Sequence, residues 1–61
     1  MPMLRLDMLP GRTPEQKSAF VREVTRVAVE TLKCTQESVD IVITEVAREH
    51  WAKAGKLMSE S

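Results

Sequence analysis

The small size of this chain constrains its fold more than any other feature. Its 61 residues bury only about 60% of the surface that the unfolded chain exposes, which leaves a marginal core. Ordering each residue costs roughly 1.5 kcal/mol, and domains of this size compensate with disulfides, a metal ion or partner subunits. The single cysteine, Cys34, excludes an internal disulfide, and the single histidine, His50, leaves too few ligands for structural zinc. We therefore expect oligomerisation to complete the fold.

Charge and hydropathy narrow the classes of function. Nine basic and nine acidic residues are interleaved rather than grouped. A nucleic-acid or membrane-surface role usually needs a basic patch, so neither is expected. No apolar run approaches the roughly 20 residues of a membrane span, and Arg5 and Asp7 interrupt the start, unlike a secretory signal. We expect one domain over residues 1–61 in the cytoplasm, a reducing compartment that suits the lone Cys34.

The first predicted element is a β-strand over residues 3–9. Leu4, Leu6 and Met8 alternate with other residues, which is the period of a half-buried strand. The pair Pro10 and Gly11 then predicts a turn that ends the strand.

A long helix is predicted from about Pro14 to Lys33. Thr13 can cap it, Pro14 suits the first helical position, and Gln16 stands where a capping box needs it. Apolar residues then recur at three- and four-residue steps and form a wide stripe: Phe20, Val21, Val24, Val27, Ala28 and Leu32. Polar residues fall largely outside this stripe: Gln16, Lys17, Arg22, Glu23, Arg26 and Glu30. Residues 34–38 are expected to form the loop that leaves the helix.

A second strand is predicted over residues 39–46, VDIVITEV, which are rich in β-branched side chains. Two strands joined through a long helix normally pair in parallel. Ile41 and Ile43 lie on one face, and Val42 and Val46 on the other, so both faces should be covered. The helix can cover one face, and copies of the same chain must cover the other.

The residues after the second strand show no clear period. Gly55 suggests a short turn or hairpin, followed by a frayed tail. The predicted fold class is therefore α/β: a short β-α-β unit with parallel strands and a C-terminal hairpin or turn, completed as a closed symmetric homo-oligomer.

Pro2 carries the clearest chemical signal. If the initiator Met1 is removed, Pro2 becomes a secondary amine at the head of a strand. An α-amino group titrates at about 8 in water, and desolvation disfavours its cation. Such a base is well matched to moving a proton between oxygen and carbon positions of a substrate. The alternative is that a proline is merely tolerated at the first residue of a strand.

Several motifs occur together along nearly the whole chain: Pro2, LPGRTPEQK at 9–17, REV at 22–24, IVITEVAREHW at 41–51 and AGK at 54–56. With this spacing and length, the chain resembles the 4-oxalocrotonate tautomerase family of small-subunit tautomerases. The resemblance implies an isomerase that interconverts enol and keto forms of 2-hydroxy-dienoates or related enol acids, in aromatic compound catabolism. It implies no cofactor, removal of Met1, Pro2 as general base, and a homohexamer arranged as a trimer of dimers.

The resemblance also assigns substrate-binding residues. Arg12 matches the arginine that holds a substrate carboxylate, and a guanidinium suits this because it makes bidentate contacts with carboxylates. A solvated arginine before a helix is the alternative. Trp51 falls where the family places an aromatic residue in the apolar wall near the proline. Packing between subunits is the alternative for Trp51, and the two roles are compatible.

Asp40 departs from the family pattern, which has a second arginine there, supplied by a neighbouring subunit. A carboxylate repels dicarboxylate substrates and favours the cation of a nearby amine. Three interpretations stay open. In the first, the enzyme tautomerises another enol acid, with Arg5 or Arg48 as candidates to replace the lost charge. In the second, Asp40 activates water beside a protonated Pro2, as in hydrating, dehalogenating or decarboxylating relatives. In the third, the chain is a non-catalytic subunit of a mixed hexamer. A solvent-facing Asp40 with no catalytic part is the simplest alternative.

The remaining candidates have structural interpretations. His50 lacks a partner nucleophile and is expected at the surface, and Cys34 is expected to be structural because no base accompanies it. Glu45, near the end of the second strand, is expected at a subunit contact or in solvent.

Overall fold

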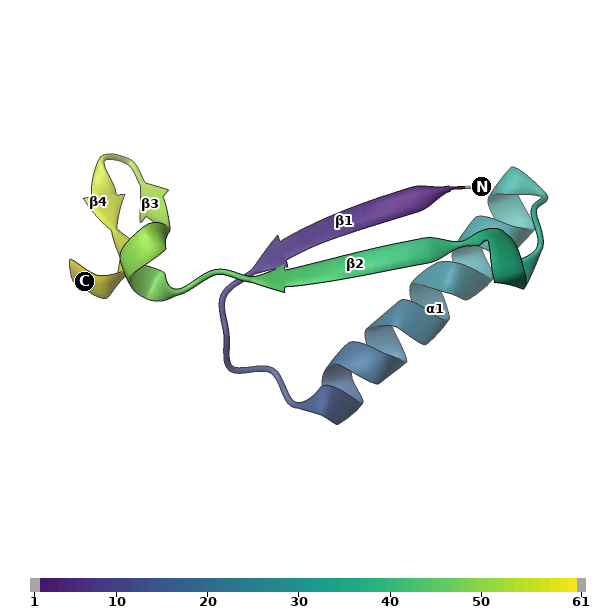
Figure 1. The fold of residues 1–61 in the computed structure, drawn as a ribbon, viewed down its shortest axis with the longest axis horizontal. Helices are drawn as coiled ribbons and strands as arrows, with labels where there is room; N and C mark the ends of the chain where they lie inside the picture. Colours follow the sequence, from purple (N-terminus) through teal and green to yellow (C-terminus); the bar gives the residue numbers. More distant parts are fainter. Residues whose placement is uncertain (1, 61) are drawn as a thin grey trace.

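A computed structural model describes residues 2–60 and has the predicted β-α-β order. Strand β1 covers Met3–Met8, helix α1 covers Pro14–Leu32, and strand β2 covers Asp40–Glu45. The two strands pair in parallel, from Met3 opposite Asp40 to Met8 opposite Glu45, and α1 lies on one side of them (Figure 1). The predicted α/β class and the parallel pairing are confirmed, and each predicted element ends within one residue of the observed one.

The ends of α1 follow the sequence signals. The Thr13 hydroxyl accepts a hydrogen bond from the Gln16 N–H at 3.1 Å, and the Gln16 side chain accepts from the Thr13 N–H at 2.9 Å. This reciprocal pair is the predicted capping box, with Pro14 at the first helical position. The helix ends at Lys33, whose left-handed backbone (φ 58°) lets its N–H donate to the Val29 carbonyl at 3.1 Å.

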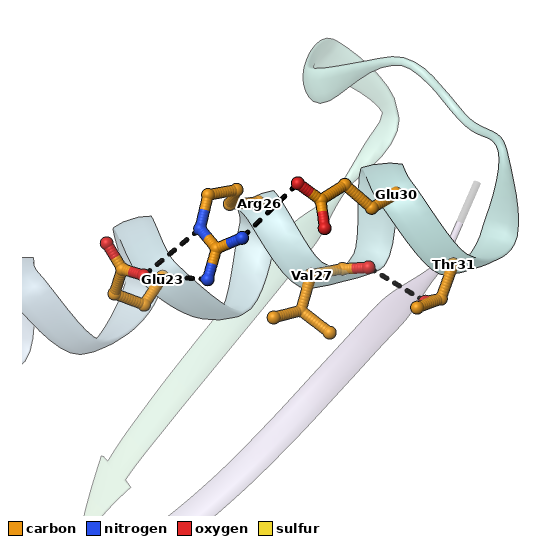
Figure 2. Close-up of polar contacts among 5 residues, drawn as sticks. All are labelled: Glu23, Arg26, Val27, Glu30 and Thr31. Atoms are coloured by element: carbon orange, nitrogen blue, oxygen red, sulfur yellow. Dashed lines mark hydrogen bonds and ion pairs between the residues drawn. The ribbon is translucent and has the colours of Figure 1, made fainter.

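The solvent side of α1 carries a charged cluster (Figure 2). The Arg26 guanidinium donates to the Glu23 carboxylate at 3.1 Å and to the Glu30 carboxylate at 3.3 Å. The hydrogen bond with Glu23, and the charges of Glu23 and Glu30, raise the pKa of Arg26 above its ordinary value. One turn along, the Thr31 hydroxyl donates to the Val27 carbonyl at 2.8 Å. These contacts stay within the helix and leave its opposite side to the sheet.

The two faces of the β1–β2 sheet differ in what covers them. The face toward α1 carries half-buried side chains, namely Leu4, Leu6, Met8, Ile41 and Ile43. The other face, here called the open face, carries exposed ones, namely Met3, Arg5, Asp7, Asp40, Val42 and Thr44. Only the first face is covered within this chain, as the alternation of residues in the two strands predicts.

The chain by itself does not cover its apolar surface. Among residues 2–60, Ala28 is the only buried residue, and 7% of its surface is still exposed. The radius of gyration is 14.6 Å, against about 10.5 Å for a compact domain of this length. The exposed surface is 4893 Å², against roughly 4000 Å² for a compact monomer of this mass. Several large apolar side chains remain exposed, up to 60% for Leu32: Met3, Phe20, Val27, Leu32 and Val42. This shape supports the expectation that other chains complete the fold.

Residues 48–60 form a small unit, here called the C-terminal unit, beyond the end of β2 (Figure 1). It contains a one-turn helix at Arg48–His50, strand β3 at Ala52–Lys53, the antiparallel strand β4 at Lys56–Leu57, and a one-turn helix at Met58–Glu60. The residues between the strands, Ala54 and Gly55, both have positive φ, as a tight hairpin turn requires. The predicted hairpin is confirmed.

The predicted frayed tail is wrong as far as Glu60. The Glu60 carboxylate accepts from the Leu57 N–H at 3.1 Å, and the Met58 N–H donates to the Trp51 carbonyl at 2.8 Å. Residues 34–38, predicted as a loop, likewise contain a one-turn helix, at Gln36–Ser38. Both misses are single turns closed by local hydrogen bonds, which leave no periodic pattern. Within the part of the chain described, no helix is both long and apolar enough to cross a membrane.

Candidate functional site

Pro2 and Asp40 lie at the same end of the sheet. The Pro2 carbonyl accepts a hydrogen bond from the Asp40 N–H at 3.0 Å, immediately before the register pair of Met3 and Asp40. Pro2 is half-buried, whereas Asp40 is exposed on the open face. Residue 1 lies outside the described residues, so the expected removal of Met1 stays a prediction. The pairing of the strands thus brings the predicted base next to the one residue that departs from the family pattern.

Arg12 lies at the opposite end of the sheet, in the loop between β1 and α1. It is exposed and borders a hollow of about 370 Å³ between the sheet and the first turns of the helix. The floor of this hollow is apolar and its rim is polar, with the lining residues Leu6, Met8, Arg12, Gln16, Lys17, Phe20 and Ile43. An apolar floor beside a guanidinium can hold a small molecule by its carboxylate, or an apolar side chain of another subunit.

Lys17 is a residue that the sequence analysis missed at this end. Its ammonium group donates to the Glu45 carboxylate at 2.8 Å and so links α1 to the last residue of β2. Lys17 was predicted outside the apolar stripe, and Glu45, predicted in solvent or at a subunit contact, is exposed. The pairing of the two side chains was not predicted. The alternation of residues in β2 could have predicted this pair, because it places Glu45 on the same face as Ile41 and Ile43, toward the helix.

Trp51 belongs to the C-terminal unit. It is half-buried, its carbonyl accepts from the Met58 N–H at 2.8 Å, and its own N–H donates to the Arg48 carbonyl at 3.4 Å. These backbone contacts hold Trp51 beyond the carboxyl end of β2, not beside Pro2. The aromatic wall that the resemblance assigns to Trp51 can therefore lie near a proline only if that proline belongs to another chain.

The two candidates for replacing the missing arginine have different surroundings. The Arg48 guanidinium donates to the Met58 carbonyl at 3.2 Å and is engaged within the C-terminal unit. Arg5 lies on the open face, opposite Val42 and two residues along β1 from Met3. Of the two, Arg5 is therefore on the same face as Asp40. His50 is exposed, and the half-buried Cys34 thiol contacts the Ala28 carbonyl at 3.6 Å, both in line with the structural interpretations.

The predicted site residues thus form two groups that one chain does not bring together. Pro2 and Asp40 precede or begin the strands, whereas Arg12 and Trp51 follow them. The six residues of β1 rise by about 3.3 Å each, so about 20 Å of strand separates the two groups. A site that contains Pro2, Arg12 and Trp51 needs at least two chains.

Similarity to known proteins extends over nearly the full length of the chain. The family model described as "Tautomerase enzyme" matches residues 2–61. The 2-hydroxymuconate tautomerase of Bacillus subtilis strain 168 is 40% identical over 60 residues, which are 98% of this chain and 97% of that protein.

Solved structures agree with the sequence comparison. A crystal structure of a 4-oxalocrotonate tautomerase homologue has a TM-score of 0.95 at 38% identity, covering 100% of this chain and 97% of the other. A chain of the heterohexameric 4-oxalocrotonate tautomerase from Chloroflexus aurantiacus J-10-fl has a TM-score of 0.91 at 35% identity, covering 98% and 97%. The likeness therefore extends to sequence and fold at full length.

Proposed function

The chain belongs to the tautomerase family, and from this premise we propose that it interconverts enol and keto forms of a 2-hydroxy-dienoate or a related enol acid. It is similar to isomerases of the 4-oxalocrotonate type, as its sequence motifs predicted. The observation that carries the proposal is Pro2, half-buried and tied by its carbonyl to the first residue of β2 at the head of the sheet.

The proposed reaction is an isomerisation, so the substrate and the product contain the same atoms, and it requires a single base. After removal of Met1, the Pro2 nitrogen takes the proton from the enol oxygen of the substrate. The electrons of the O–H bond form the carbonyl, the conjugated double bonds shift, and the protonated amine returns its proton to a carbon of the chain. A fixed ring holds the nitrogen lone pair in one direction, and the half-buried position limits the water that would stabilise its cation.

Arg12 and Trp51 supply binding in this proposal, from a chain other than the one that supplies Pro2. The guanidinium of Arg12 holds the substrate carboxylate at the apolar hollow. Trp51 lines the apolar wall. The separation of the two groups supports an oligomeric enzyme, which we take to be a homohexamer built as a trimer of dimers. We further place it in the cytoplasm as a single domain over residues 1–61.

Ketonisation of 2-hydroxymuconate and of phenylenolpyruvate, followed by ultraviolet absorbance, tests the proposal on protein whose terminus is shown by mass spectrometry to be Pro2. Pro2→Ala should lower kcat/KM by a factor on the order of 10² to 10⁴, the usual contribution of a general base. Pro10→Ala is the matched control, because Pro10 is an exposed proline in the turn after β1. Equal rates in the two variants and the wild type would refute the role of Pro2.

A second candidate function is suggested by the strand register, in which the Asp40 N–H donates to the Pro2 carbonyl and so places the two residues side by side. An acid beside a protonated amine can activate water, so a hydratase, dehalogenase or decarboxylase reaction is the alternative. Asp40→Asn should abolish such a reaction and spare tautomerisation. The other alternative, a non-catalytic subunit of a mixed hexamer, predicts that native mass spectrometry of the purified chain detects no hexamer.

A further inference from the structure

The ion pair of Lys17 and Glu45 joins α1 to β2 at the end of the sheet where Arg12 lies. The Lys17 ammonium group donates to the Glu45 carboxylate at 2.8 Å. The other ion pairs of residues 2–60 are those of Arg26, and they lie within α1. Among the described residues, the Lys17–Glu45 pair is therefore the charged link that fixes one element relative to another.

Packing contributes little to the position of the first turns of α1. A hollow of about 370 Å³ separates these turns from the sheet, and Lys17 borders it. The buried residue of α1, Ala28, lies toward the other end of the helix. The second half of α1 is thus held by apolar contact, whereas its start depends on a charged link beside the hollow.

Arg12 is coupled to Lys17 through the backbone. Arg12 directly precedes Thr13, which caps α1 through its reciprocal hydrogen bonds with Gln16. The Thr13 carbonyl also accepts from the Lys17 N–H at 3.1 Å. These bonds make the first turn of the helix a rigid unit, so a movement of Lys17 relative to β2 displaces the backbone next to Arg12 as well.

Glu45 is fixed on its own side of the ion pair. The N–H of Val46, the next residue, donates at 2.8 Å to the carbonyl of the last residue of β1. The same stretch leads into the C-terminal unit, where Trp51 follows six residues after Glu45. The Glu45 carboxylate is therefore an anchor with a fixed place at the end of the sheet, close in sequence to the second predicted binding residue.

We propose that Lys17 and Glu45 are a pair of positioning residues that hold Arg12 in place for the substrate carboxylate, without contacting the substrate themselves. This inference rests on the proposed function, in which Arg12 binds that carboxylate. Without the pair, the start of α1 takes up other positions, and the apparent affinity falls with the fraction of chains that keep Arg12 in place. A partly exposed ion pair changes such an equilibrium by up to about fivefold.

The experiment measures kcat and KM for 2-hydroxymuconate in Lys17→Met and Glu45→Gln, which each remove one charge at similar size. Both should raise KM about two- to fivefold at nearly unchanged kcat, because the proposed base belongs to another chain. Arg26→Met is the matched control, since it removes ion pairs of α1 that stay within the helix, and its KM should equal that of the wild type. Native mass spectrometry checks the assembly of each variant.

The sign of the Glu45→Gln effect separates positioning from direct binding. If Lys17 itself held the substrate carboxylate, Glu45→Gln would release its ammonium group and KM would fall instead of rise. The exchange of both charges, Lys17→Glu with Glu45→Lys, should bring KM back toward the wild-type value, because opposite charges face each other again.

An Arg12→Ala background gives a readout that a merely structural role would not move. Lys17→Met should change kcat/KM little there, because the residue that Lys17 positions is gone, whereas a general structural effect would lower kcat/KM equally in both backgrounds. An unchanged or lower KM in Glu45→Gln, or an undiminished effect of Lys17→Met in Arg12→Ala, overturns the inference and leaves the tautomerase proposal standing. No ketonisation by assembled wild type that begins at Pro2 overturns both.

Discussion

The two ends of the β1–β2 sheet carry complementary halves of the proposed site. At the amino end, the Pro2 carbonyl and the Asp40 N–H meet, and the charge near the predicted base is negative. At the carboxyl end, Arg12 and Lys17 border an apolar hollow, and Lys17 binds Glu45 at 2.8 Å. The amino end has the predicted base but no cation to bind the substrate carboxylate. The carboxyl end has cationic side chains but no base. Because a hydrogen-bonded ladder holds the ends apart, only a second chain can join them.

The strongest test of this division mixes two inactive variants. Pro2→Ala and Arg12→Ala should each lose about 100-fold or more in kcat/KM when assayed alone, since each removes one half of the site. After co-refolding at equal amounts, about a quarter of the sites in a randomly mixed oligomer should combine an intact Pro2 with an intact Arg12. Activity should then recover to that fraction of the wild type. No recovery in a mixed oligomer confirmed by mass would contradict a site shared between chains.

The next largest effect is expected for a substitution on the open face. Val42 is an exposed apolar residue at its centre, and we expect another subunit to cover it. Val42→Asp should weaken assembly by several kcal/mol, because an unpaired carboxylate would have to be buried. Sedimentation velocity should then show a smaller species and the tautomerase rate should fall with it. Thr35→Asp, an exposed change in the loop after α1, is the control. A Val42→Asp oligomer of normal size and affinity would mean that the open face stays in water.

A smaller effect is expected at the start of α1, which positions the Arg12 loop. Thr13→Ala removes the hydroxyl that accepts from the Gln16 N–H, leaves the backbone N–H that donates to the Gln16 side chain, and should lower the free energy of unfolding by about 1 kcal/mol. Thr35→Ala is matched to it, because Thr35 also precedes a helical turn but its side chain makes no capping bond. Chemical denaturation at fixed protein concentration measures both. Equal losses in the two variants would argue against the cap.

The smallest effect concerns the ion pair at the carboxyl end. Lys17 and Glu45 keep side-chain exposures of 29% and 36%, so solvent screens much of their attraction. A double-mutant cycle of Lys17→Ala and Glu45→Ala should give a coupling of about 0.2–1 kcal/mol, which declines at high salt. Replacing Lys53, an exposed lysine of the hairpin, should show no coupling to Glu45. A coupling insensitive to salt would point to packing, not charge.

Local sequence rules were sufficient to predict the two long strands and the helix. The alternation of Leu4, Leu6 and Met8 predicted β1, and the Thr13–Gln16 spacing predicted a cap that the structure contains. These features depend on residues within a few positions of one another, so a single sequence carries them. The one-turn helix at Met58–Glu60 and the Lys17–Glu45 pair were not foreseen, because the first leaves no period and the second joins residues 28 apart in the chain.

By itself the sequence determined the parallel β-α-β unit, the family, and which residues are chemically suited to act: Pro2, Arg12, Trp51 and Asp40. Only the tertiary structure decided where they lie relative to one another. Register between strands is a non-local property, set when the whole ladder pairs, and it places Asp40 beside Pro2 while it holds Arg12 and Trp51 at the opposite end. That separation, together with an apolar surface that one chain leaves exposed, is the reason for proposing a site built from more than one copy.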